Sequence, residues 1–329
     1  MKVAFFDTKP YDIPGFDRYA ADAGLEIKYF EPKLNIDTVS LASGFDAVCV
    51  FVNDAVTAEV VEKLSEMGVK AIALRCAGYN NVDLQACQGK LRVFRVPAYS
   101  PYAVAEHAMA LLLSVNRRIH KAHIRTREFN FSLQGLTGFD LHGKTVGIIG
   151  TGKIGRVFAD ICKGFGMRIL AYDKFPNPAT GLEYASLEEV FAQSDILSFH
   201  CPLTEETQHM VCADSIAHMK EGVVLINTSR GGLVNTTDLI QGLKSGKVGA
   251  ACLDVYEEEG EVFYEDLSGH IMRDDNLVRL IAMPNVIVTS HQAFLTREAL
   301  DNIASTTVSN LHRFFAGNPD ETTEVVYQA

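Results

Sequence analysis

Residues 146–155 read VGIIGTGKIG, and this stretch decides the fold of the 329-residue chain. An apolar run ends in the pattern Gly-x-Gly-x-x-Gly, and a segment with helical periodicity follows it. A second apolar run begins at Arg168 and ends at Asp173, 18 residues after the last glycine of the pattern. The succession predicts a strand, a tight turn, a helix and a second strand that ends in an acidic residue, which is the fingerprint of a dinucleotide-binding fold.

Each part of the fingerprint has a physical role. Gly150 makes a tight turn, Gly152 lets the backbone approach a pyrophosphate, and Gly155 lets the helix pack closely on the strand. The helix N-terminus offers N–H groups and partial positive charge to the phosphates. Asp173 is placed to accept hydrogen bonds from the adenosine ribose and to repel a 2′-phosphate, so the pattern favours NAD over NADP.

Composition narrows the class of protein. The length favours two domains, and a hydrophobic content of 47% supports large cores. The net charge of −11 argues against nucleic acid or an anionic membrane as a partner. The seven cysteines form no Cys-x-x-Cys pair, which indicates free thiols in a reducing compartment. With no signal peptide and no apolar run near the ~20 residues that span a bilayer, we expect a soluble, cytoplasmic protein.

The order of apolar runs predicts two α/β domains. Strand-like runs alternate with helical segments near residues 3–6, 26–30, 47–52, 71–74 and 93–96, and again near 145–149, 168–172, 195–199, 223–227, 248–253 and 286–289. Such alternation predicts parallel sheets with helices on both faces. We predict two doubly wound domains with a cleft between them: a flavodoxin-like substrate domain (1–99 with 296–329) and a Rossmann NAD domain (100–295).

Three chemically suited side chains follow predicted strands of the second series. They are Arg230, Glu259 and His291. The carboxyl ends of parallel strands are where open α/β sheets bind ligands. Hydride transfer on a 2-hydroxy acid needs a guanidinium for the carboxylate, an imidazole for the hydroxyl proton, and a carboxylate that orients the imidazole. We therefore predict these three as the catalytic residues.

An ordered series of motifs then makes the chain recognisable. They are RCAGYNNVD at 75–83, VPAYSP at 96–101, GTGKIG at 150–155, HCPLT at 200–204, NTSRG at 227–231, LDVYEEE at 253–259 and SHQAF at 290–294. Over essentially the whole chain they resemble the D-isomer-specific 2-hydroxyacid dehydrogenase family, and within it the fermentative D-lactate dehydrogenases of bacteria. The resemblance implies NAD-dependent, reversible reduction of pyruvate to D-lactate.

The resemblance also implies roles for individual residues. Arg230 binds the substrate carboxylate, and His291 is the acid/base with Glu259 as its partner. The other substrate-binding residues are Ala77 and Gly78, through backbone N–H groups, and Tyr99 and Phe294, as walls. With Phe51, these aromatic walls suggest a compact pocket for a small side chain. The apolar segment 102–116 and the arm 117–142 are expected to form a subunit contact in a homodimer or homotetramer.

The implied cofactor site draws on most of the second domain. Lys153 and Ile154 lie over the pyrophosphate, and Asp254 holds the nicotinamide carboxamide. The full set is Gly150, Gly152, Lys153, Ile154, Gly155, Asp173, Cys201, Pro202, Thr207, Thr228, Ser229 and Asp254. One residue departs from the pattern: Thr207 stands where the family usually carries Asn, so its cofactor contact loses the amide.

Other functions remain open at this stage. The substrate could be another small 2-keto acid, such as glyoxylate, hydroxypyruvate or a branched keto acid. A regulatory protein that senses NAD could keep the same three residues. A metal enzyme is disfavoured, because His120 and His123 lack acidic ligands in register.

Overall fold

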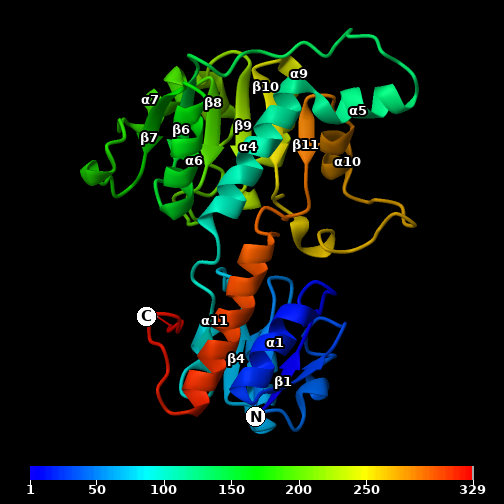
Figure 1. The fold of residues 1–329 in the computed structure, drawn as a ribbon, viewed down its shortest axis with the longest axis vertical. Coiled ribbons are helices and arrows are strands. Elements are labelled where there is room, and N and C mark those ends of the chain that lie inside the picture. The colour runs from blue at the N-terminus through cyan, green and yellow to red at the C-terminus, as the bar shows by residue number, and fades with distance from the viewer. Residues whose placement is uncertain (328–329) are drawn as a thin grey trace. The chain divides into compact units, whose positions relative to one another are not determined.

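A computed structural model describes residues 1–327 and divides the chain into two units. Unit 1 combines Met1–Ser100 with the segment that starts at Phe294, and unit 2 is Pro101–Ala293. In Figure 1, unit 1 carries the blue-to-cyan elements and the orange-to-red last helix, and unit 2 carries the turquoise-to-orange elements.

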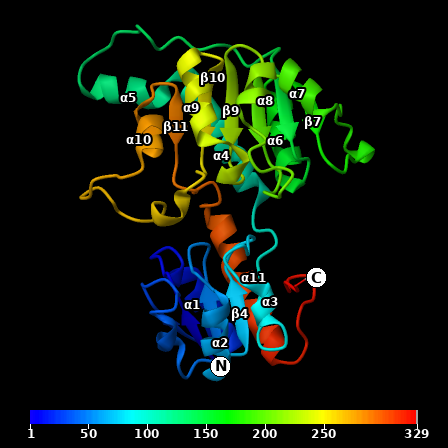
Figure 2. The ribbon, with the colours of Figure 1, turned by 180° about the vertical axis from the view of Figure 1, so that it is seen from behind.

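Unit 1 is built on a five-stranded, all-parallel sheet in the order β2-β1-β3-β4-β5. Helices α1 and α11 lie on one face, and α2 and α3 on the other (Figures 1 and 2). The strand order is that of flavodoxin-like sheets, with the switch point between β1 and β3. The elements are β1 (Lys2–Phe5), α1 (Ile13–Ala23), β2 (Glu26–Tyr29), η1 (Val39–Ala42), β3 (Ala47–Val50), α2 (Ala58–Glu66), β4 (Ala71–Leu74), α3 (Leu84–Cys87), β5 (Arg92–Phe94) and α11 (Arg297–Phe315).

Unit 2 is built on a six-stranded parallel sheet in the order β11-β10-β9-β8-β6-β7. Its elements are α4 (Pro101–Arg117), α5 (Ile119–Arg127), β6 (Thr145–Ile149), α6 (Lys153–Gly164), β7 (Arg168–Tyr172), η2 (Pro178–Thr180), α7 (Leu187–Gln193), β8 (Ile196–Phe199), α8 (Ala213–His218), β9 (Val223–Asn227), η3 (Gly231–Leu233), α9 (Thr236–Ser245), β10 (Val248–Leu253), η4 (Glu259–Glu261), α10 (Asp275–Ala282) and β11 (Val286–Val288). The predicted fold class, two doubly wound parallel sheets, is confirmed.

The sheet of unit 2 is buried on both faces, which explains the continuous apolar runs of its strands. One core cluster joins the sheet to α4 and α6 and includes Leu112, Ile148 and Phe158. The other joins it to α7, α8, α9 and α10 and includes Phe199 and Leu239. The apolar helix predicted near 102–116 is thus a core helix of unit 2, because one side of α4 packs on α6 and on the sheet.

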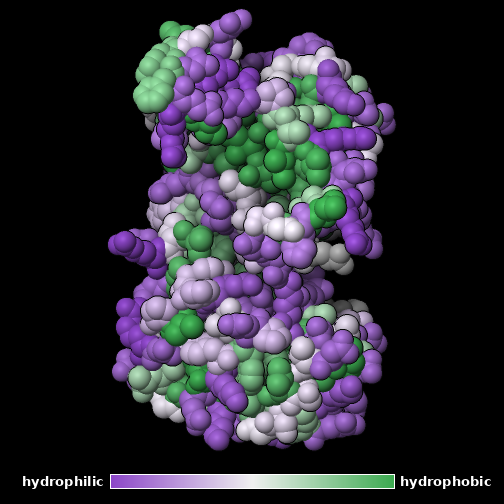
Figure 3. Space-filling view, turned by 90° about the vertical axis from the view of Figure 1, so that its right-hand side faces the viewer, coloured by the Kyte–Doolittle hydropathy of each residue, from purple (hydrophilic) through white to green (hydrophobic). Residues whose placement is uncertain are grey.

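The segment after α4 carries apolar side chains on its surface. Helix α5 buries no residue, and Phe129, Phe131 and Leu133 in the arm that follows are 84%, 70% and 80% exposed. Apolar surface is visible on the α5 and α10 side of unit 2 (Figure 3). Exposed apolar side chains gathered in this way mark an interaction surface.

Two glycines set the geometry of the fingerprint turn between β6 and α6. Gly150 has a φ of +94°, and a Cβ at Gly155 would lie 2.0 Å from the carbonyl oxygen of Gly150. The start of α6 therefore packs directly on the end of β6. Gly164 lies at the far end of the same helix, where a Cβ would meet nothing within 4 Å.

We predict that Gly155→Ala destabilises the protein by about 1–3 kcal/mol, because the new methyl group has no room. Gly164→Ala is the matched control and stabilises by up to about 1 kcal/mol, since alanine is the better helix former. Urea unfolding followed by circular dichroism measures both. Equal stability of the two variants would contradict the close contact between Gly155 and Gly150.

Candidate active site

The N-terminus of α6 is open. Gly152 is its N-cap, no side chain caps the helix, and a Cβ at Gly152 would meet nothing within 4 Å. On the other side of the turn, a Cβ at Gly150 would lie 2.6 Å from the Cys201 nitrogen, so the loops after β6 and β8 are in contact. Space beside an uncapped helix N-terminus is suited to a phosphate group, so the turn fits the pyrophosphate of a dinucleotide.

A cavity of about 690 Å³ opens beside this turn. Its lining includes six of the predicted cofactor residues, namely Gly150, Gly152, Asp173, Cys201, Pro202 and Thr207. The predicted residues Lys153, Ile154, Gly155, Thr228, Ser229 and Asp254 lie outside that lining. The volume falls within the range of small-molecule sites, about 300–1,000 Å³.

Asp173 directly follows β7, as the sequence predicts, and its carboxylate is tied to the fingerprint turn. One oxygen accepts hydrogen bonds from the Thr151 N–H (2.6 Å) and the Thr151 hydroxyl (2.8 Å), and the other accepts from the Phe175 N–H (2.9 Å). Burial raises the pKa of Asp173, but these hydrogen bonds outweigh it and bring the pKa below its ordinary value. The group is therefore a carboxylate at neutral pH, as a ribose acceptor must be.

Three further predicted cofactor residues differ in what their hydroxyl groups do. The Thr207 hydroxyl donates to the Pro202 carbonyl (2.8 Å) and accepts from the Thr204 N–H (2.8 Å), so it stabilises its own loop. Ser229 donates to the Cys201 carbonyl (2.6 Å). The buried Thr228 hydroxyl has no hydrogen-bond partner within residues 1–327. An unpartnered buried hydroxyl is costly, and a bound dinucleotide would supply its missing partner.

His291 and Glu259 are brought together. The His291 Nδ1 lies 2.7 Å from a Glu259 carboxylate oxygen, and the other oxygen accepts from the Tyr256 N–H (2.9 Å). Because the carboxylate is an acceptor, the Nδ1 carries the hydrogen and the Nε2 is left for chemistry. Both side chains are about one-fifth exposed, so they are held by protein and reachable by a small molecule.

Arg230 lies in the neighbouring loop. Asn227, the last residue of β9, donates to the Arg230 carbonyl (2.9 Å), and Arg230 donates to the Ser229 carbonyl (2.7 Å). A Cβ at Gly231 would lie 2.0 Å from the Tyr256 carbonyl oxygen, so the loop after β9 touches the loop after β10. These contacts place Arg230 beside the segment that carries Glu259.

Asp254 is fully buried and holds the His291 loop. Its carboxylate accepts hydrogen bonds from the Thr289 hydroxyl (2.6 Å) and from the N–H groups of Gln292 (3.0 Å) and Ala293 (2.8 Å). His107 of α4 lies 3.3 Å from the same carboxylate. Burial raises the pKa of Asp254, but the hydrogen bonds from His107, Thr289 and Ala293 bring it below its ordinary value. The carboxamide contact stays a prediction.

The backbone at His291 is strained. Its φ of +51° is uncommon for a residue with a side chain. Its N–H donates to the Asp254 carbonyl (2.7 Å), and the Tyr264 hydroxyl donates to the His291 carbonyl (3.0 Å). Sequence reasoning missed Tyr264 and His107. The one available signal was a histidine inside an otherwise apolar helix.

In unit 1, the predicted substrate residues lie at and near the carboxyl edge of the sheet. Ala77 and Gly78 follow β4, and their N–H groups donate to nothing within the described part of the chain. Phe294 lies 6.1 Å from Tyr99 and 6.1 Å from Phe51, measured between ring centroids. Unpartnered N–H groups are suited to a small carboxylate, and a cluster of aromatic rings is suited to an apolar side chain.

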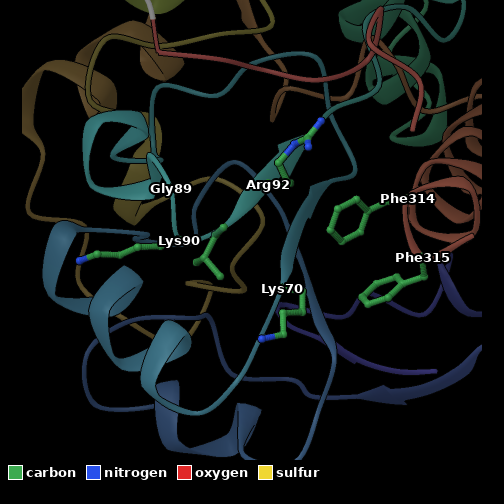
Figure 4. Close-up of a pocket in the computed structure, with 7 residues that line it drawn as sticks. Lys70, Gly89, Lys90, Arg92, Phe314 and Phe315 are labelled. Carbon is green, nitrogen blue, oxygen red and sulfur yellow. The ribbon is translucent and has the colours of Figure 1, made fainter. Parts of the chain in front are cut away.

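A second pocket, of about 400 Å³, lies beside the start of β5 and the end of α11 in unit 1 (Figure 4). Its cations Lys70, Lys90 and Arg92 point in different directions. Lys90 pairs with Glu62, and Arg92 pairs with Glu324. Among its described lining residues, the charged groups do not converge on one point.

Two wider searches covered residues 1–327. No group of three or more His, Cys, Asp or Glu side chains is placed to hold a metal ion. None of the helices in the described part combines the length and the apolar character that crossing a membrane requires.

Known proteins resemble this chain along nearly its full length. Residues 109–293 match the NAD-binding domain of the D-isomer specific 2-hydroxyacid dehydrogenases. D-lactate dehydrogenase of Escherichia coli (strain K12) is 49% identical, with 96% of this chain and 98% of that protein covered. Its apo structure superposes with a TM-score of 0.91 at 47% identity, covering 99% and 100% of the two chains. A structure described as the pyruvate reductase of Chlamydomonas reinhardtii gives 0.92 at 43% identity, covering 97% of each chain.

His200, in the lining of the 690 Å³ cavity, gives a test of acid stability. Burial lowers the pKa of His200 to about 4, and its Nε2 contacts the Ser198 hydroxyl at 2.9 Å. The unfolded imidazole has a pKa of about 6.5. The unfolded chain therefore takes up a proton first as the pH falls, and the free energy of unfolding decreases between these values by at most about 1.4 kcal/mol per pH unit.

We predict that His200→Gln loses less stability than the parent between pH 7 and pH 5. Denaturant midpoints at the two pH values measure the effect, and His312→Gln on α11 is the control with an exposed histidine. An identical loss in parent and His200→Gln would contradict the lowered pKa.

Proposed function

The chain belongs to the D-isomer-specific 2-hydroxyacid dehydrogenase family, and from this premise we propose that it is an NAD-dependent D-lactate dehydrogenase, which reduces pyruvate to D-lactate reversibly. The observation that carries the proposal is the 2.7 Å pair of His291 and Glu259, next to the Arg230 loop on the sheet that bears the dinucleotide fingerprint. The E. coli relative that carries this name supports the choice of substrate.

His291 is the proton donor in this mechanism. NADH, when bound, supplies the hydride for C2 of pyruvate. The His291 Nε2 delivers a proton to the keto oxygen as it becomes an alkoxide, while Glu259 holds the ring at Nδ1 and stabilises its charged form. In the reverse direction the neutral Nε2 accepts the proton of the lactate hydroxyl.

Arg230 acts on the substrate carboxylate. A guanidinium offers two parallel N–H donors to a carboxylate, which fixes the orientation as well as the charge. In unit 1, the N–H groups of Ala77 and Gly78 donate to nothing within the described residues and are suited to a carboxylate. Phe51, Tyr99 and Phe294 form a compact aromatic cluster suited to the methyl group of pyruvate.

The function is tested by NADH oxidation with a panel of 2-keto acids, with NADPH in parallel. We expect fast turnover with pyruvate and NADH. Preference for a bulkier keto acid would change the assigned substrate but leave the proposed mechanism unchanged. NADH binding without turnover on any keto acid would overturn the proposal and favour a protein that senses NAD.

We predict that His291→Ala lowers kcat for pyruvate by about 10²–10⁴-fold, because the acid/base is lost. NADH binding, measured by fluorescence titration, stays unchanged. The matched control is His218→Ala, an exposed histidine on α8, which keeps parental turnover. A normal kcat in His291→Ala would contradict the proposed acid/base role of His291.

The quaternary state and the compartment complete the proposal. We propose a homodimer or homotetramer whose contact includes α5 and the arm after it, since the exposed Phe129, Phe131 and Leu133 need cover. We propose a cytoplasmic location, which the odd number of cysteines and the lack of a Cys-x-x-Cys pair in the sequence support.

The oligomer is tested by light scattering of the purified protein. We predict at least twice the 36.1 kDa chain mass for the parent, and a lower mass for Phe131→Asp with Leu133→Asp. Val326→Asp in unit 1, which also replaces an exposed apolar side chain, is the control and keeps the parental mass. A monomeric parent would contradict the proposed contact.

A further inference from the structure

Unit 1 contains a buried cation that the proposed mechanism does not use. Arg75 directly follows β4 and is 2% exposed. It lies one residue before the segment that contains Ala77 and Gly78, at the carboxyl edge of the sheet. Arginine is almost never fully buried without partners. The contacts of Arg75 therefore indicate its structural role.

The side chain of Arg75 ties the end of β4 to the loop between β1 and α1. It donates to the carbonyl groups of Phe6 (3.0 Å) and Asp7 (2.6 Å), which follow β1. Its Nε lies 3.4 Å from the Asp12 carboxylate, and its backbone N–H donates to the Val50 carbonyl (3.1 Å) at the end of β3. The planar fork therefore holds the loop after β1 against the end of β4, while the main chain of Arg75 links β4 to the end of β3.

The same guanidinium lies between two aromatic rings. Its Cζ is 4.5 Å from the ring centroid of Phe5 and 4.7 Å from that of Phe51. Phe51 in turn contacts Phe294, which contacts Tyr99. Arg75 is thus the base of an aromatic series that ends in the two proposed walls of the substrate pocket.

The turn after Arg75 is fixed through its carbonyl groups. The Cys76 carbonyl accepts from the Val96 N–H (3.0 Å), and the Ala77 carbonyl accepts from Arg95 (3.0 Å). The Cys76 thiol donates to the Gly78 carbonyl (3.2 Å). The N–H groups of Ala77 and Gly78 donate no hydrogen bond within residues 1–327. Because the turn directly follows β4 and Arg75, its position depends on how Arg75 is held.

Arg75 does not itself attract an anion. The carboxylates of Asp7, Asp12 and Asp54 surround it, and Lys9 pairs with Asp7 at 2.8 Å. Burial lowers the pKa of Arg75, but these carboxylates raise it above its ordinary value, so the group stays charged. Three carboxylates against two cations leave no positive charge for a substrate carboxylate.

We propose that Arg75 is a positioning residue that determines substrate specificity: it holds the Phe51 ring against the pocket and the 76–78 turn beneath the substrate carboxylate. This inference rests on the proposed reduction of a 2-keto acid. The role requires a flat, stacked cation with a forked donor set, which lysine lacks although it keeps the charge.

The test compares Arg75→Lys with the parent on pyruvate and on 2-oxobutyrate, which is longer by one methylene. We expect the ratio of kcat/KM values, pyruvate over 2-oxobutyrate, to fall about tenfold, the scale at which a pocket discriminates one methylene. KM for pyruvate rises more than kcat falls. The Kd of NADH, a ligand of unit 2, stays unchanged.

Matched variants separate positioning from general stability. Arg92→Lys changes an arginine of the same unit that also pairs with a carboxylate and lies over a phenylalanine, and it keeps the parental ratio. Phe51→Leu lowers the ratio as Arg75→Lys does, and the double variant lowers it no further, because both changes act through one ring. If Arg75→Lys does not fold, Phe5→Leu loosens the guanidinium from its other face and shifts the ratio in the same direction.

An unchanged ratio in folded Arg75→Lys, with a lower melting temperature, would show that Arg75 only stabilises the unit and would overturn the inference. Additive effects of Arg75→Lys and Phe51→Leu would also overturn it. A parent that turns over no 2-keto acid would instead refute the proposed function, so the two failures are distinct.

Discussion

The carboxylate of Asp254 is fully buried and receives hydrogen bonds from Thr289, Gln292 and Ala293, with His107 close by. These groups surround His291, whose left-handed backbone conformation costs about 1–3 kcal/mol. The hydrogen bonds from this loop to Asp254 offset that cost, because a buried carboxylate without partners costs more. The direction of the His291 imidazole therefore depends on the buried Asp254 carboxylate.

Parallel strands impose the other constraint on the site. Residues that follow the strands of unit 2 fall at one edge of the sheet, in the order Gly150, Asp173, Cys201, Arg230, Asp254 and His291 along the chain. Loops that leave neighbouring strands at one edge must pass close to each other. Glycine occupies the two tightest of these passages, Gly150 against the loop after β8 and Gly231 against the loop after β10.

Much of this could be predicted from the sequence. Each strand of unit 2 is a continuous apolar run, because a doubly wound sheet is buried on both faces, and glycines mark the fingerprint turn. The pairing of His291 with Glu259 was also predictable, since both follow neighbouring strands. The links from Thr151 to Asp173 and from His107 to Asp254 were not. Partners 22 and 147 positions apart leave no periodic signal.

Arg75 and Asp254 have the same structural role, which is to hold loops in place, although their charges are opposite. Each lies at a carboxyl edge, where several loops must hold fixed positions without a regular element to order them. A buried cation among carbonyls, or a buried anion among N–H groups, forms hydrogen bonds about twice as strong as neutral ones. Apolar packing could supply comparable stability at either position, but it would tolerate shifts of the loops. A forked guanidinium or a carboxylate is satisfied in few arrangements, so the charge fixes the geometry of the loops that carry the chemistry.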